Sequence, residues 1–182
     1  MRRALAALAC ALLVGSCGGG DSSDPARDRL AAAERTLADH PRDPRAMEAV
    51  IRAAAAGYGD HVDPVSGVPD PQARGYLARA VAAWRRYLTA THGHPRPAAA
   101  GTMVSVFGNG LHRPRDAERA AVLLTQAAPS SANYLVLVQW ASKAGDRRTA
   151  RFAGGSALEL AEPRERERVQ QVIRAYGAAP GG

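Results

Sequence analysis

The sequence has 182 residues, a formal net charge of +7 and only two cysteines, which excludes a disulfide-rich scaffold. The chain must therefore be held together by its own core, and about 150 ordered residues can bury roughly two-thirds of their unfolded surface, enough for one domain. Of the 24 basic residues only Lys143 is lysine, and the arginines are spread over several predicted helices rather than gathered in one stripe, which argues against nucleic acid as a partner.

Residues 1–17 have the pattern of a secretory signal peptide. Two arginines precede an apolar run too short to span a bilayer, and the run ends Val14-Gly15-Ser16-Cys17. This ending resembles a bacterial lipobox. The resemblance implies a lipoprotein signal peptide over 1–16 and a lipid such as palmitate on Cys17, which would anchor the protein to the extracytoplasmic face of the cell membrane. A soluble secreted protein, cut near the same place, is the alternative.

Cleavage before Cys17 would change both the cysteine count and the charge. Cys10 would leave with the signal peptide and Cys17 would be blocked by lipid, so no disulfide is available. Removal of Arg2 and Arg3 lowers the formal charge by two, from +7 to +5. Because the mature chain stays basic, a receptor role for anionic cell-wall polymer or lipid headgroups is an alternative function.

Residues 17–24 comprise the lipidated cysteine and a stretch without apolar residues, which predicts a flexible tether. Asp24 then precedes Pro25, a pair typical of a helix N-cap and first helical residue. Apolar residues recur at three- and four-residue spacing from there to His40. This spacing predicts a helix with one narrow buried stripe.

Asp43-Pro44 repeats the same start signal. We expect a helix from Arg45 to Gly57, because glycine readily supplies the left-handed residue that ends a helix. Its buried face is formed by Met47, Val50, Ile51 and Ala54.

An insertion loop is predicted over residues 58–70, where prolines and glycines prevent either neighbouring helix from continuing. Asp60, His61 and Asp63 suggest a metal site, but three groups within four loop residues lack the ligand spacing of a calcium or zinc site. We therefore expect turn formers, no metal and no cofactor. A contact role for this long loop stays open.

Asp70-Pro71 predicts the start of the longest helix, which should end near Gly93. Three rings of this segment, Tyr76, Trp84 and Tyr87, fall at helical spacing on the face to be buried, so a core stripe is favoured over a ligand platform.

The next helices are marked by prolines. Pro97 and Pro114 each open a helix, and Pro129 ends the second one. The prolines at 95, 129 and 163 are 34 residues apart, and the interval from Pro41 to Pro95 is 54 residues, or one such unit plus the insertion loop.

The stretch 131–163 reads as one helix hairpin. Its segment 134–140, YLVLVQW, is apolar and β-branched enough for a buried strand, but Ser130 or Ser131 can cap a helix before it and Gly145 can end one. The residues that carry the hairpin pattern are Tyr134, Leu137, Ala141, Ala150, Ala157, Leu158 and Pro163.

This pattern resembles a tetratricopeptide repeat (TPR), with Val138 and Gly154 as departures. The resemblance implies an all-α fold over 25–176, a TPR-like superhelix built as a right-handed solenoid of helix hairpins. A polar-faced helix from Pro163 to Tyr176 would cap the stack, and 177–182 would be a disordered tail.

Repeats of this family stack their first helices along a concave face that receives peptides. The resemblance implies that the outward residues of these helices form a peptide-binding groove: Arg45, Glu48, Arg52, Thr102, Ser105, Asn109, Leu135, Val136, Gln139 and Lys143. Cationic and amide donors beside an apolar patch suit a peptide with an acidic end and an apolar side chain. Arg52, Asn109 and Lys143 would hold a terminal carboxylate, as Lys and Asn do in some family members. A solvated groove with no single ligand is the alternative.

Catalytic motifs are absent from the sequence. It contains no nucleophile elbow, zinc-binding H-E-x-x-H helix, phosphate loop or nicotinamide fingerprint, and Gly108-Asn109-Gly110 lacks the third glycine of such a loop. The sequence therefore favours a membrane-anchored scaffold for a protein or peptide partner over an enzyme.

Overall fold

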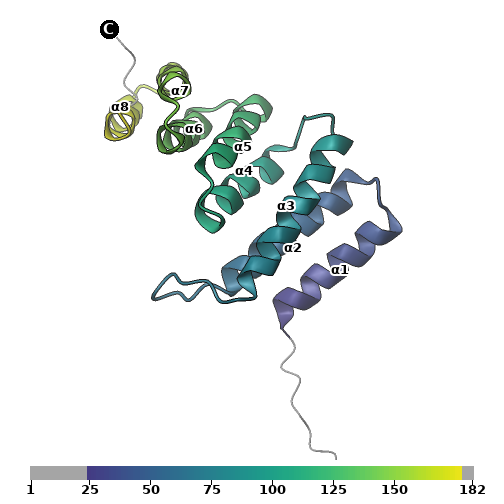
Figure 1. The fold of residues 1–182 in the computed structure, drawn as a ribbon. Helices are drawn as coiled ribbons and strands as arrows, with labels where there is room; N and C mark the ends of the chain where they lie inside the picture. The colour runs from purple at the N-terminus through teal and green to yellow at the C-terminus, as the bar shows by residue number, and fades with distance from the viewer. Residues whose placement is uncertain (1–23, 178–182) are drawn as a thin grey trace, which may run out of the picture.

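The computed structural model describes residues 24–177. Within that range the chain forms helices and no strands (Figure 1), so the all-α prediction is confirmed there. The predicted signal peptide, Cys17, the tether before Asp24 and the tail after Gly177 lie outside the described residues. The elements are α1 (Pro25–Asp39), α2 (Pro44–Asp60), α3 (Ala73–Ala90), α4 (Pro97–Ser105), the π-helical segment η1 (Val106–Gly110), α5 (Pro114–Ala127), α6 (Ser131–Ala144), α7 (Arg147–Glu159) and α8 (Arg166–Ala175).

Polar side chains fix the first turns of several helices. Asp24 and Asp43 each accept a hydrogen bond from the backbone N–H two residues on, both at 2.9 Å, and a proline follows each as the first helical residue. Ser130 accepts a hydrogen bond at 3.2 Å from the N–H three residues on. Because each cap satisfies a backbone donor that the helix leaves free, it contributes about 1 kcal/mol. The three predicted starts are confirmed.

Gly57 does not end α2, so that prediction is wrong. The helix continues to Asp60, and Gly57 is buried within it. A Cβ atom on Gly57 would lie 2.5 Å from the ring of Tyr76 on α3. Glycine is therefore needed here for the close approach of two helices rather than for a left-handed turn.

Two predicted helix starts are displaced by a few residues. The carboxylate of Asp70 accepts hydrogen bonds from the N–H groups of Gln72 (2.7 Å) and Ala73 (3.0 Å), so a turn precedes α3, which begins at Ala73. Pro163 likewise begins a turn, and α8 starts at Arg166. In both places the proline follows an acidic residue, but the helix begins only after the turn is complete.

The ambiguous segment 134–140 is helical, which rules out the strand interpretation. Gly145 ends α6 in the left-handed conformation, with φ of 81°, and its N–H bonds the carbonyl groups of Ala141 and Ser142. The local cap and stop signals therefore outweigh the β propensity of the side chains between them.

The π-helical segment η1 was not predicted. It continues α4 directly, and the N–H of Leu111 bonds the carbonyl oxygen of Val106 at 2.9 Å, five residues back. A single π turn of this kind widens the helix and is frequent at functional sites. It changes the direction in which the side chains before Pro114 project.

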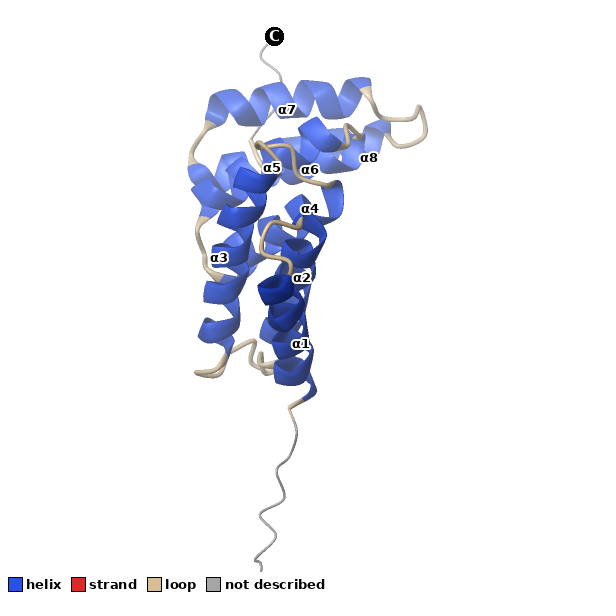
Figure 2. Ribbon diagram, turned by 90° about the vertical axis from the view of Figure 1, so that its right-hand side faces the viewer, coloured by secondary structure: helices blue, strands red, loops and turns tan. Residues whose placement is uncertain are grey.

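Most helices pack side by side with the next helix in the chain, but α4 lies against α2 more than against α3. Helix α2 lies between α1 and α3, α4 packs on α5, and α6 packs on both α5 and α7, while α8 contacts α6 and α7. Figures 1 and 2 show that α6 to α8 lie across the direction of α1 to α3. Within residues 24–177 no helix combines the length and apolar character needed to cross a bilayer.

Small side chains set the spacing of these helices. Fully buried alanines occupy the helix contacts, and larger apolar side chains such as Ile51, Met103 and Leu137 fill the space beside them. The distance between packed helices depends on the side chains at the contact, so alanine permits close approach. Alanines without exposed surface include Ala54, Ala100, Ala121, Ala141 and Ala153.

Candidate functional site

A pocket of about 410 Å³ lies where η1, the start of α5 and the end of α6 meet. Its lining combines polar and apolar groups: an amide, an imidazole and an ammonium group lie beside an indole and a proline ring. The lining residues are Gly108, Asn109, His112, Pro114, Trp140 and Lys143.

Trp140 forms the rigid wall of this pocket. Its side chain is buried, and the Nζ of Lys143, three residues on along α6, lies 4.4 Å from the ring centroid. This cation–π contact orients an ammonium group that stays exposed to solvent. A Cβ atom on Gly108 would overlap the Trp140 indole, so glycine is needed here for the close approach of η1 to α6.

The backbone beside the pocket has two unusual features. One is η1 itself, and the other is His112, which has φ of 51° although it is not glycine. Such conformations cost free energy and are found disproportionately at functional sites. Asn109 belongs to η1, and both Asn109 and His112 line the pocket together with Trp140.

Asn109 and Lys143 were both predicted to hold a carboxylate, and they line the same pocket. Arg52, the third predicted member, is exposed on α2 and is not part of that lining. Sequence reasoning missed Trp140 and His112. The three-residue spacing of Trp140 and Lys143 on one helix face was a signal that could have identified the first of these.

Glu48 does not face outward as predicted. It is only 8% exposed, and its carboxylate lies 3.4 Å from the guanidinium of Arg96, in the turn before α4. Glu48 therefore links α2 to the start of α4 and is withdrawn from the predicted groove.

The remaining residues of the predicted groove do not line the pocket that contains Asn109 and Lys143. Leu135 and Val136 are half-buried and pack against the core, so they do not form a free apolar patch. Thr102 uses its hydroxyl to bond the carbonyl oxygen of Ala98 at 2.9 Å. The others are exposed or half-buried: Arg45, Ser105 and Gln139.

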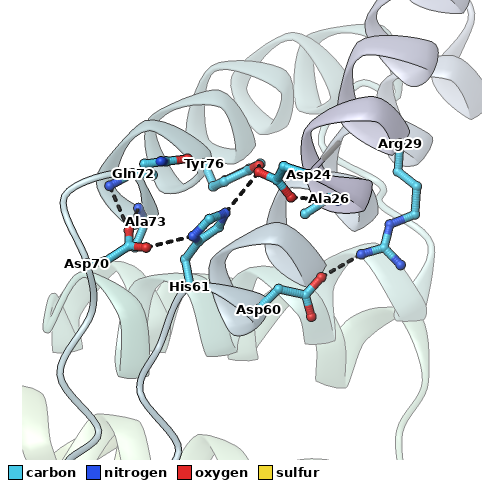
Figure 3. Close-up of polar contacts among 9 residues, drawn as sticks. All are labelled: Asp24, Ala26, Arg29, Asp60, His61, Asp70, Gln72, Ala73 and Tyr76. Carbon is cyan, nitrogen blue, oxygen red and sulfur yellow. Dashed lines mark hydrogen bonds and ion pairs between the residues drawn. The ribbon is translucent and has the colours of Figure 1, made fainter. Parts of the chain in front are cut away.

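A second polar cluster lies where the insertion loop meets the first turn of α1 (Figure 3). His61 sits between two carboxylates, with Nδ1 2.7 Å from Asp70 and Nε2 3.1 Å from Asp24. The hydroxyl of Tyr76 donates to the same oxygen of Asp24 at 3.0 Å. The rings of His61 and Tyr76 stack with centroids 5.1 Å apart.

Each of these charges changes the pKa of its partner. The hydrogen bond to Asp70 raises the pKa of His61 above its usual 6.5, against the effect of desolvation, and Asp24 adds to the increase. Desolvation alone would raise the pKa of Asp24, but its hydrogen bonds from His61 and Tyr76 outweigh that effect and lower the value. The pKa of Asp70 is lowered for the same reasons, chiefly by His61.

These shifts predict a pH-dependent contribution to stability. The folded state binds the His61 proton more tightly than the unfolded chain, so the contribution is complete below pH 6.5 and is lost as pH rises through the raised pKa. The two carboxylates, Asp24 and Asp70, make a separate contribution to stability. It is complete above pH 3.8, the usual carboxylate pKa, and is lost as pH falls through their lowered pKa values. In chemical denaturation, His61→Gln should remove the loss above pH 6.5. An unchanged pH profile in that variant would contradict the assignment to His61.

The cluster corrects the expectation that His61 is a turn former. Only Asp63 acts in that way, accepting hydrogen bonds from the N–H groups of Val65 and Ser66, while Asp60 pairs with Arg29. Between residues 24 and 177 no group of three or more His, Cys, Asp or Glu side chains is arranged to hold a metal ion. The contact of His61 with Asp24 connects the insertion loop to the N-cap residue of α1.

Comparison with protein-family models, curated proteins and solved structures finds no match for this chain. The function proposed below therefore rests on the residues and contacts of the chain itself.

Proposed function

We propose that this protein is a lipid-anchored, extracytoplasmic scaffold that binds the carboxyl end of a partner peptide in the pocket beside η1. In this proposal α2/α3, α4/α5 and α6/α7 are the hairpins of a TPR-like superhelix, with α1 as a partial repeat and α8 as the cap. The two helices of each hairpin pack on one another, and α2 contacts α4 and α5 packs on α6 between hairpins, which supports this reading.

The observation that carries the proposal is the lining shared by Asn109, Trp140 and Lys143. An ammonium group and a carboxamide N–H are suitable donors to a carboxylate, and the indole and the Pro114 ring offer an apolar surface to the adjoining side chain. The donors and the indole come from η1 and α6, so a ligand in the pocket would contact both of these elements. The lipobox-like sequence that ends at Cys17 supports the membrane-anchored location in this proposal.

Lys143→Glu is expected to weaken peptide binding by about tenfold or more. A hydrogen bond to a charged group contributes about 1.5–3 kcal/mol, and about 1.4 kcal/mol corresponds to a tenfold change in Kd. The measurement is fluorescence anisotropy with a pool of labelled peptides that end in a leucine and a free carboxylate. The same peptides with amidated ends should bind wild-type protein as weakly as the free peptides bind the variant.

Arg35→Glu is the matched control, because it makes the same change of charge at an exposed residue of α1 that is not in the pocket lining. It should bind within about twofold of wild type. Equal losses in the two variants would assign any binding to net charge, and equal binding of free and amidated peptides would exclude recognition of the carboxylate.

A further inference from the structure

A groove runs between α3 and α5 on a part of the surface that shares no residue with the pocket beside η1. It consists of two hollows of about 340 and 310 Å³, and Leu123 of α5 lines both. The first hollow is lined by Val81, Trp84, Arg85, Leu88, Phe107, Arg113, Asp116, Arg119, Ala120 and Leu123. The second continues along α5 to Ala127 and is closed by the turn from Gly93 to Pro97.

The floor of the groove is apolar. Trp84 and Phe107 are buried, while Leu88 and Leu123 are half-buried and present part of their surface to the opening. The α3 residues recur at three- and four-residue spacing, and so do the α5 residues from Asp116 to Ala127, so each helix offers one continuous face. The walls therefore extend over about three helical turns of α5.

The rim of the groove is cationic. Arg85 and Arg119 are exposed, and Arg113 lies over the Phe107 ring, 5.6 Å from its centroid. Asp116 is the single carboxylate of the first hollow, and it is already paired with Arg113 and Arg119. The lining of the first hollow therefore contains three arginines and one carboxylate. Helix α3 itself carries four arginines and no acidic residue.

The arginines of this surface come from two helices and a turn, so residues that are spread over several elements in the sequence are brought together in the fold. Helix α3 contributes Arg85 beside the groove, and α5 with its preceding turn contributes Arg113 and Arg119. The excess positive charge stands above an apolar floor. A simple polyanion would use the rim but gain nothing from the floor, whereas an amphipathic segment with acidic residues would use both.

We propose that the groove between α3 and α5 binds an acidic, amphipathic helix of a partner protein. The apolar face of that helix rests on Trp84, Leu88 and Leu123, with anchors at the i, i+3 or i+4, and i+7 positions, and its carboxylates pair with Arg85 and Arg119. This site is independent of the carboxylate pocket, so one scaffold molecule holds two segments at once.

The test uses synthetic amphipathic peptides that differ in one property at a time. The first has leucine at i, i+3, i+4 and i+7 with glutamate on the other face, the second has lysine in place of glutamate, and the third is a scramble of the first. Fluorescence anisotropy at physiological salt should give binding of the first peptide to the full chain at least tenfold tighter than binding of the other two. Absence of binding, or equal binding of the scramble, would overturn the proposal.

Two double variants distinguish binding in the groove from non-specific attraction of the acidic peptide to a basic protein. Arg85→Glu with Arg119→Glu should weaken binding of the first peptide at least tenfold, while Arg148→Glu with Arg151→Glu, the same charge change at exposed residues of α7, should change it less than twofold. Equal losses, or equal competition by polyphosphate or anionic vesicles, would replace the proposal with a general anion-binding surface. Circular dichroism checks folding, and Gln replaces Glu in any variant that fails to fold.

The two binding proposals fail separately. Lys143→Glu should leave binding of the amphipathic peptide unchanged, because Lys143 does not line the groove. Leu88→Ala with Leu123→Ala should weaken the amphipathic peptide at high salt, where the arginine contacts are screened, and should leave the carboxylate-ended peptides unaffected.

Discussion

Metabolic labelling with a palmitate analogue is expected to label the wild-type protein and the Cys10→Ser variant equally, and to leave Cys17→Ser unlabelled. The chain has two cysteines, so the two variants form a matched pair that differ only in which thiol remains. The effect is all or none, because Cys17 is the thiol that ends the lipobox-like sequence, whereas Cys10 lies within the apolar run of the predicted signal peptide. Gel fluorescence after membrane extraction measures it directly.

The reason for this expectation lies in the order of two arginines, a short apolar run and the residues Val14 to Cys17, which resembles a lipobox. Each CH₂ group of an acyl chain that enters the bilayer contributes about 0.8 kcal/mol, so loss of the lipid removes most of the membrane affinity. Label on Cys17→Ser, or equal loss in Cys10→Ser, would show that the anchor is elsewhere. Mass spectrometry of the mature amino terminus is the independent check.

Alanine at Gly108 and alanine at Gly101 are expected to change the free energy of unfolding in opposite directions. The two glycines lie seven residues apart on the continuous segment of α4 and η1. A methyl group at Gly108 overlaps the buried indole of Trp140, whereas a methyl group at Gly101 meets no atom within 4 Å. We expect Gly108→Ala to destabilise the fold by about 1–3 kcal/mol through overpacking.

Gly101→Ala should instead stabilise by about 0.5–1 kcal/mol, because alanine loses less conformational entropy than glycine in a helix. Urea denaturation followed by circular dichroism measures both values. Gly108→Ala should also move the Trp140 ring and so change its fluorescence and weaken binding of carboxylate-ended peptides. Stabilisation by both substitutions would mean that the close contact between η1 and α6 is absent in solution.

Local signals explain which parts of the fold were predictable. Asp24, Asp43 and Ser130 cap helices through hydrogen bonds to residues two or three positions on, and such short-range pairs are visible in the sequence. The burial of Trp84 and Tyr87 follows from their helical spacing. These features depend on neighbours along the chain, and they were predicted.

The features that escaped prediction depend on neighbours in space. Gly57 has the composition of a helix stop, but its role is set by the Tyr76 ring on another helix. The cluster around His61 joins Asp24, 37 residues earlier, to Asp70, nine residues later. No spacing rule connects such residues, so the sequence suggested turns where the fold builds a network.

The candidate site divides in the same way. Asn109 and Lys143 were predicted by resemblance to a family, because their helix positions could be counted. The wall formed by Trp140 was not predicted, since it requires the extra residue of the π turn that brings Gly108 against the ring. The burial of Glu48 against Arg96 was missed because the partner follows 48 residues later.

If Cys17 carries the proposed lipid, the contacts of Asp24 limit how far the folded domain can reach from the membrane. Asp24 is held by His61 and Tyr76, so the folded body begins at that residue without slack. A lipid on Cys17 would leave only seven peptide units between surface and body, which span at most about 25 Å when fully stretched. The domain would then bind its partner close to the bilayer surface. Lengthening the segment between Cys17 and Asp24 should increase the distance from the membrane at which the domain binds, without changing its affinity for the partner.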